Sequence, residues 1–226
     1  ELLFAVGDQG VWRSTDFGGS WNVTPLSVPD WPDTISSFTD IRISRADPDV
    51  VWTGSRMDAK GSILVSTDQG LSFAPTTDVP GMGGISGLAT HPTDPNTAYV
   101  LFSFANSPKI LRTTDLGTTW TDITGFASGA PSSNGFPDVA VYHLLVFPND
   151  TDKIWVGTEI GLVESVDGGA VTDDRSTADG VVCYAGVDWW YHNRGHSECQ
   201  VMTRLAEDHR VLWVNSIGMR MPSPGG

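Results

Sequence analysis

One short pattern occurs four times in this chain, and it constrains the fold more than any other feature. The copies run from Ser14 to Trp21, from Ser66 to Phe73, from Thr113 to Trp120 and from Ser165 to Ala170. The third position of each copy is an aspartate, and these aspartates follow one another at intervals of 52, 47 and 52 residues. That period is typical of four-stranded β-propeller blades and not of helical repeats. The sequence therefore predicts a mainly β repeat protein.

The residue types of the pattern explain why it recurs. Its aspartate can accept hydrogen bonds from backbone N–H groups of its own turn, its glycine can adopt positive φ, and its last aromatic residue can pack back onto the blade. We therefore expect the recurring positions to be structural rather than catalytic or metal-binding. They are Ser14, Asp16, Gly18 and Trp21; Ser66, Asp68, Gly70 and Phe73; Thr113, Asp115, Gly117 and Trp120; and Ser165, Asp167 and Gly169.

The pattern is identified as the Asp-box, also called the BNR repeat. It resembles the repeats of sialidases, sortilin-type receptors and xyloglucanase-type propeller glycosidases. The resemblance covers residues 1–170 and implies a propeller in which each box occupies a hairpin at the outside of a blade, away from the channel where ligands bind. It also implies a secreted or cell-surface bacterial protein for this part of the chain.

The segments around the boxes divide this region into blades. Residues 2–25 supply three strands, residues 39–78 and 85–125 supply four each, and residues 141–165 supply three. The first blade lacks an inner strand and the last lacks an outer one. We therefore predict a partial, open propeller of about three to four four-stranded blades. Its open blade edges offer a route to self-association.

Residues 181–226 differ in character from the repeats. Apolar segments at 181–186 and 211–215 flank a helical pattern from about 193 to 209, which predicts a short α/β unit of βαβ type. The polar residues 171–180 are expected to form a linker or a fusion junction. Because this boundary interrupts the fourth repeat, the sequence favours a chimeric reading frame over a natural two-domain protein.

The final segment is similar to the N-terminus of two-Rossmann-domain retaining glycosyltransferases, and this similarity suggests a cytoplasmic origin for residues 181–226. The resemblance implies an acceptor loop whose candidate residues are Asp188, His192, Arg194 and His196. The second domain of that family, which binds the nucleotide sugar, has no counterpart in the sequence. We therefore expect no glycosyl transfer by this chain.

Charge argues against several partners. The formal net charge is −14, and the whole acidic excess lies in residues 1–180. Such a surface repels phosphate backbones and anionic lipid headgroups, so nucleic acid and bare membrane are not expected partners. The sequence contains no apolar run of about 18 residues or more, so it predicts no membrane span.

Few residues form a pattern that carries chemistry. His192, His196 and Cys199 lie close together in the sequence but lack the further ligands of a zinc site, so we expect neither a metal nor a cofactor. Propellers usually place groups that contact a ligand on or just after the innermost strands. Four basic side chains occupy such positions: Arg42, Arg45, His91 and His143. Charged residues at solvated strand ends are the more common explanation of such positions.

Three functions remain open. The leading hypothesis is a non-catalytic propeller segment that acts as a scaffold or as a protein- or glycan-binding surface, because every recurring residue has a structural explanation. The first alternative is a fragment of a secreted propeller glycoside hydrolase, whose two catalytic carboxylates the spacing does not identify. The second is a glycosyltransferase relationship through the final segment alone.

Overall fold

The computed structural model describes residues 2–26, 39–58, 63–127 and 130–169, together with residues 181–185 and 211–215. Within these residues all regular structure is β. The described part of the chain contains no helix long and apolar enough to cross a membrane.

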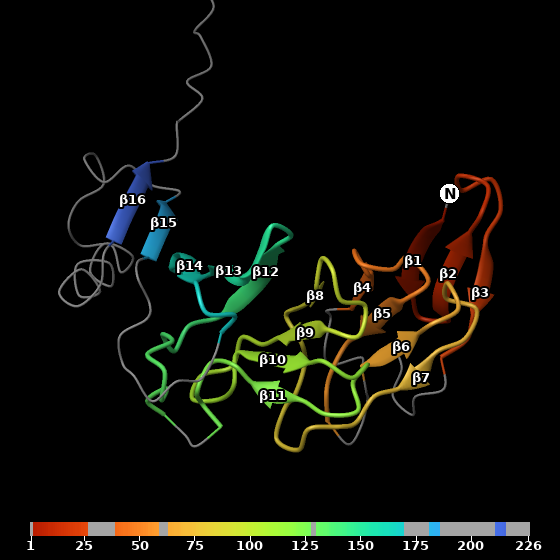
Figure 1. Ribbon diagram of the computed structural model, residues 1–226. Coiled ribbons are helices and arrows are strands. Elements are labelled where there is room, and N and C mark those ends of the chain that lie inside the picture. Colours follow the sequence, from red (N-terminus) through yellow and green to blue (C-terminus); the bar gives the residue numbers. More distant parts are fainter. Residues whose placement is uncertain are drawn as a thin grey trace, which may run out of the picture.

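The strands form four sheets that follow one another along an open arc (Figure 1), and we call these sheets blades 1 to 4. Blade 1 contains β1 (Leu3–Gly7), β2 (Gly10–Ser14) and β3 (Asn22–Thr24). Blade 2 contains β4 (Asp40–Ile43), β5 (Val51–Gly54), β6 (Leu64–Ser66) and β7 (Ala74–Pro75). Blade 3 contains β8 (Gly87–Thr90), β9 (Ala98–Leu101), β10 (Ile110–Thr113) and β11 (Thr121–Asp122). Blade 4 contains β12 (Val141–Phe147), β13 (Asp150–Thr158), β14 (Gly161–Ser165), β15 (Val181–Ala185) and β16 (Val211–Asn215).

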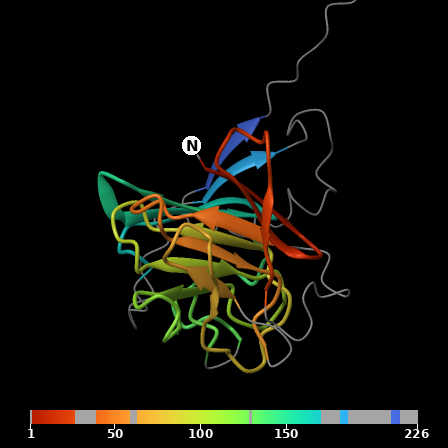
Figure 2. The ribbon, with the colours of Figure 1, turned by 90° about the vertical axis from the view of Figure 1, so that its right-hand side faces the viewer.

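This arrangement confirms the predicted partial, open propeller. Strand pairing from β1 to β14 is antiparallel throughout, and the sheets of consecutive blades lie one behind another when the chain is viewed from the blade 1 end (Figure 2). The blades carry the expected number of strands up to residue 165. Blade 1 has three, blades 2 and 3 have four, and blade 4 has three before the chain passes residue 169.

The register of the strand pairs makes the blades equivalent position by position. The first residue of each box pairs across the sheet with Leu3, Val51, Ala98 or Ile154. The residue before each box pairs with an aromatic residue, which is Phe4, Trp52, Tyr99 or Trp155. β1 therefore corresponds to β5, β9 and β13. Within the described residues, blade 1 therefore has no counterpart of β4, β8 and β12, as the sequence predicts.

The core lies between the blades. Successive side chains of a strand point to opposite faces of its sheet, so each blade presents one face to the blade before it and the other to the blade after it. Trp52 of blade 2 belongs to one buried cluster with Val100 and Leu111 of blade 3. Tyr99 of blade 3 belongs to a second cluster, with Val163 of blade 4. Burial of this apolar surface holds the blades against one another.

Blade 4 differs from the sequence-based expectation at its outer edge. The expectation was that this blade has no outer strand, but β15 pairs antiparallel with β14 and occupies that position. β16 then pairs in parallel with β15, which is the pairing that a βαβ connection produces. The expected helix at about 193–209 lies outside the described residues. The predicted boundaries at 170 and 180 remain predictions.

Candidate functional site

The first three boxes share one hydrogen-bond pattern. In box 2, the Ser66 hydroxyl donates to Asp68 Oδ1 at 2.7 Å and accepts from the N–H of Gly70 at 2.8 Å. Asp68 Oδ1 also accepts from Ser72 N at 2.9 Å, while Oδ2 accepts from Ser72 Oγ at 2.6 Å. The same four bonds recur in boxes 1 and 3. Both oxygens of each aspartate therefore bind within the turn that contains it.

One member of this pattern is not among the positions predicted from the sequence. The hydroxyl residue four positions after each aspartate is Ser20, Ser72 or Thr119, and each donates from both its backbone N–H and its side chain. The recurrence of Ser or Thr before the aromatic position was the available signal. In box 4, Asp167 Oδ1 accepts from Ser165 Oγ at 2.6 Å and from Gly169 N at 3.1 Å.

The box turns use two consecutive residues in the left-handed region. The box glycines have φ of 86° at Gly18, 77° at Gly70 and 82° at Gly117, which agrees with the glycine at this position. The residue before each glycine also has positive φ, although it is not glycine. Phe17 has φ of 57°, Gln69 of 61° and Leu116 of 55°. Nothing in the residue types at these positions predicts this conformation.

Hydrogen bonding lowers the pKa of the box carboxyls. At Asp68 the bonds from the Ser72 hydroxyl, the Ser66 hydroxyl and the Ser72 N–H lower the pKa from 3.8 to about 2. At Asp16 the main cause is the Ser20 N–H, and the pKa is again about 2. The Thr119 hydroxyl is the first cause of a lowered pKa at Asp115. Each donor favours the ionised carboxylate.

These shifts predict loss of stability in acid. Because the folded-state pKa of Asp68 lies below its ordinary value, the ionised form stabilises the folded chain above about pH 4, and this contribution disappears as the pH falls toward 2. We expect Asp68→Asn to make the urea midpoint less dependent on pH between about 5 and 2. The matched control is Asp8→Asn, since Asp8 makes no side-chain hydrogen bond in the described part of the chain. Equal pH dependence in wild type and Asp68→Asn would contradict the assignment.

The boxes also contact the preceding blade. Arg13 of blade 1 donates from Nε to the carbonyl of Gln69 at 2.7 Å. The equivalent residue of blade 3, Arg112, donates from Nη1 to the carbonyl of Gly168 at 3.0 Å. Between blades 2 and 3, the Thr77 N–H donates to the Gly117 carbonyl at 2.9 Å. Each interblade joint therefore uses backbone carbonyls of a box as acceptors.

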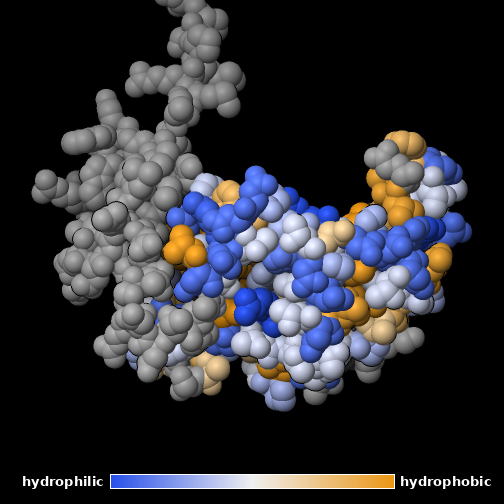
Figure 3. Space-filling view, viewed as in Figure 1, coloured by the Kyte–Doolittle hydropathy of each residue, from blue (hydrophilic) through white to orange (hydrophobic). Residues whose placement is uncertain are grey.

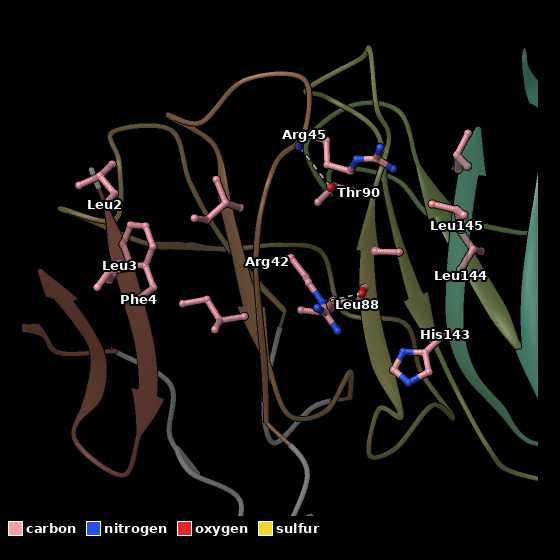
Figure 4. Close-up of a pocket in the computed structure, with 14 residues that line it drawn as sticks. Leu2, Leu3, Phe4, Arg42, Arg45, Leu88, Thr90, His143, Leu144 and Leu145 are labelled. Carbon is pink, nitrogen blue, oxygen red and sulfur yellow. Dashed lines mark hydrogen bonds between the residues drawn. The ribbon is translucent and has the colours of Figure 1, made fainter. Parts of the chain in front are cut away.

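Four strands at the inside of the arc line a groove of about 500 Å³ (Figure 4). They are β1, β4, β8 and β12, which come from four different blades. Most of the lining is aliphatic, and its charged or ionisable side chains are Arg42, Arg45 and His143. The structure thus brings together three of the four basic residues that the sequence placed near the innermost strands.

The two arginines of the groove differ in their bonding. Arg42 Nη2 lies 3.0 Å from Asp40 Oδ2, and its Nε donates to the Leu88 carbonyl at 3.1 Å. Arg45 is exposed, and its guanidinium has no hydrogen bond or ion pair within the described residues, although its backbone N–H lies 3.4 Å from Thr90 Oγ1. Arg45 therefore supplies an available cation at the groove.

Asp40 connects inner strands rather than lining the groove. Its Oδ1 accepts from Ile41 N at 2.8 Å, and its Oδ2 accepts from Leu88 N at 2.9 Å in addition to the Arg42 contact. This carboxylate therefore fastens β4 to β8. The lining of the groove, as far as the described residues show, contains no aspartate or glutamate.

His91 lies away from the groove lining. Its Nδ1 accepts from the Asp94 N–H at 3.1 Å and lies 3.3 Å from the Thr93 N–H, so the ring closes the turn after β8. Burial lowers its pKa, because removal from water disfavours the imidazolium. The sequence places His91 just after an innermost strand, and the structure agrees, but its ring does not line the groove.

The remaining candidates fall outside the described structure. Asp188, His192, Arg194 and His196, the proposed acceptor-loop residues, lie outside the described residues, as does Cys199. Among the residues that are described, no group of three or more His, Cys, Asp or Glu side chains could hold a metal ion.

Three solved structures that are similar to this chain are GH74 enzymes. A GH74 xyloglucanase from Xanthomonas campestris aligns with a TM-score of 0.55 and 20% identity over 78% of this chain and 28% of its own. A GH74 enzyme from Niastella koreensis aligns with a TM-score of 0.51 and 17% identity over 74% and 26%. An ancestral GH74 enzyme aligns with a TM-score of 0.51 and 18% identity over 74% and 21%.

These comparisons show the fold. The chain spans about a quarter of the length of each of these enzymes. No protein-family model matches it, and no curated protein matches it significantly. The fold and the comparisons together define this chain as a segment of a β-propeller.

Proposed function

We propose that this chain is a non-catalytic propeller segment whose inner groove binds a protein ligand, namely an apolar stretch of chain that carries a carboxylate. The observation that supports this function is the composition of the groove: aliphatic side chains with an unpaired arginine and without a carboxylate among the described lining residues. The boxes serve as the scaffold, because their polar atoms bind one another and the neighbouring blade.

Arg45 gives the groove its preference for an anion. A guanidinium at the edge of an apolar surface can form a bidentate, charge-assisted pair with a carboxylate. The chain as a whole is acidic, with a formal net charge of −14. A cation held free of partners on such a chain is therefore a specific feature and not part of a generally basic surface.

The apolar lining favours a peptide over a glycan. Ile43 and Leu145 line the groove and are 38% and 42% exposed, and Leu88 and Leu144 also contribute to its lining. Aliphatic side chains of a peptide bury apolar area against such a surface. The hydroxyl groups of a neutral glycan would lose hydrogen bonds to water there without new partners.

A hydrolase fragment is the less favoured alternative. Its support is the fold likeness to GH74 enzymes, at 17–20% identity. Glycoside hydrolysis generally needs two carboxylates facing one cleft. Asp40, the carboxylate nearest to the groove arginines, is bound to Arg42 and to two backbone N–H groups. The glycosyltransferase alternative depends on sequence resemblance alone.

The proposal predicts that binding depends on Arg45. A labelled aliphatic peptide with a free C-terminal carboxylate should bind the full chain, and Arg45→Gln should weaken binding roughly ten-fold, as expected for loss of one charge-assisted hydrogen bond. Fluorescence anisotropy measures both affinities. Lys153→Gln is the matched control, since it removes the same charge from β13 at a site that does not line the groove.

Two results would overturn the proposal. One is equal affinity of wild type and Arg45→Gln for the peptide. The other is turnover of xyloglucan oligosaccharides by the purified chain, which would favour the hydrolase alternative. Amidation of the peptide C-terminus should reproduce the loss caused by Arg45→Gln, because it removes the other partner of the same contact.

A further inference from the structure

Blade 1 presents a face that is covered in every other blade. Leu3 is 37% exposed, whereas the equivalent residues Val51, Ala98 and Ile154 are 0%, 1% and 1% exposed. Two of these residues, Ala98 and Ile154, belong to the buried clusters that join their blade to the preceding one. In the described part of the chain no blade precedes blade 1, so its face remains open (Figure 2).

The box of blade 1 carries the side chains that fill such a joint elsewhere. At the joint between blades 2 and 3, Trp120 packs edge-to-face on Trp52, with ring centroids 6.3 Å apart, and Leu116 packs against the same cluster. The equivalent residues of box 1 are Trp21 and Phe17, which are 39% and 73% exposed. Figure 3 shows apolar residues on the surface over β1–β3.

Two strands complete this open face. Trp12 pairs with Val23 across β2 and β3, so these side chains share a face of the sheet. Val23 is 39% exposed. We define the open face by five apolar side chains: Leu3, Trp12, Phe17, Trp21 and Val23.

The other end of the arc carries the complementary position. Trp155 of blade 4 is equivalent to Trp52, the residue that receives the box tryptophan of the following blade. Trp52 is 1% exposed, while Trp155 is half-buried and packs on Phe147 at 4.9 Å between ring centroids. Trp155 differs from Trp52 in its polar neighbours, because the Lys153 ammonium lies 5.9 Å from its ring centroid and its indole N–H donates to Glu164. The chain therefore carries, at the two ends of the described arc, one open box face and one aromatic residue at the receiving position.

We propose that the open face of blade 1 docks onto the Trp155 face of blade 4 in a second copy of this chain. The contact repeats a joint that the chain already makes between its own blades, with Trp21 packing on Trp155 as Trp120 packs on Trp52. Such a head-to-tail contact uses different surfaces on the two copies, so it builds closed rings or longer chains.

Two single variants test this arrangement. Phe17→Asp places a charge in the blade 1 face, and the positive φ of Phe17 suits aspartate, so the fold is retained. Trp155→Arg removes the receiving ring and keeps a donor for Glu164, to which Trp155 Nε1 donates. Sedimentation velocity across a concentration series should show masses above 24.3 kDa for wild type and 24.3 kDa for each variant alone.

Mixing the two variants gives the decisive result. Each retains the surface that the other has lost, so an equimolar mixture should form a dimer of twice 24.3 kDa and nothing larger. A symmetric contact between two blade 1 faces would instead leave Trp155→Arg associated and the mixture without a mixed dimer, which would overturn the proposal. A monomeric wild type would overturn it as well.

A control variant distinguishes this contact from nonspecific hydrophobic association. Leu71 belongs to box 2 and is 64% exposed, although the joint of that box with blade 1 is already made. Leu71→Asp should associate like wild type. Circular dichroism and thermal melts of all three variants should match those of the wild type at low concentration. A loss of association in Leu71→Asp would show that the blade 1 face is not specific.

Discussion

Replacing Gly117 by alanine should lower the free energy of unfolding by about 2–4 kcal/mol. Alanine is disfavoured in left-handed backbone, and its methyl group would also overpack the contact between the two blades. Gly117 has φ of 82°, and a Cβ at this position would overlap the Thr76 side chain of blade 2. The same glycine accepts the Thr77 N–H through its carbonyl. The added methyl group must therefore push apart a joint that is closed by a hydrogen bond. Urea unfolding of the full chain measures the change.

The matched control for this prediction is Gly81→Ala. Gly81 has φ of 85°, almost the same as Gly117, but a Cβ there would meet no atom within 4 Å. This replacement should lower the free energy of unfolding by about 1 kcal/mol, which is the contribution of the left-handed backbone without any overpacking. The difference between the two variants then measures the packing of a box against the preceding blade. Equal losses of unfolding free energy at both positions would show that the contact between the blades adapts to the added methyl group. The box would then stabilise only its own blade.

The repeat made most of the fold predictable from the sequence. Four boxes at intervals of about 50 residues fix the number of blades, and the apolar segments before them fix the strand order. The three strands that blade 1 shows within the described residues followed from comparing residues 2–25 with the other blades. This prediction was right because each blade can be compared with three others in the same chain.

The interblade contacts were not predictable in the same way. Arg13 and Arg112 stand just before their boxes and look like ordinary exposed strand residues, yet both bind carbonyls about 56 positions along the chain. Only the packing of one blade against the next brings these atoms together. The same reason explains the outer position of β15, since pairing of β14 with β15 depends on tertiary contact rather than on a local pattern.

The groove was only partly predictable. Strand positions identified Arg42, Arg45 and His143, because innermost strands must converge at the inside of an arc. They could not separate Arg42, which pairs with Asp40, from Arg45, which does not. His91 lies directly after β8, as the sequence predicts, but its ring turns back to close its own loop. Bonding of this kind is decided by backbone N–H groups, which every residue type shares.

The largest single effect is expected at Trp52. Trp52→Ala should lower the free energy of unfolding by about 3–5 kcal/mol, as for other large aromatic residues replaced in a core. Trp52 is 1% exposed and receives Trp120 of the next blade, so its loss empties the joint between blades 2 and 3. Trp52→Phe should cost much less, because it retains most of the ring and removes an indole N–H that has no partner within the described structure.

A double-mutant cycle with Trp120→Ala tests whether this energy belongs to the joint. Edge-to-face aromatic pairs contribute about 0.5–1.5 kcal/mol beyond the area that they bury, so the two replacements should fall short of additivity by about that amount. Trp21→Ala, at the equivalent position of blade 1, should change stability by less than about 0.5 kcal/mol when measured on the monomer, since that tryptophan is 39% exposed and no other blade of the described structure covers it. Strictly additive effects of Trp52→Ala and Trp120→Ala would mean that each ring stabilises its own blade. In that case the equivalence between the Trp120 joint and the open face of blade 1 would lose its energetic basis.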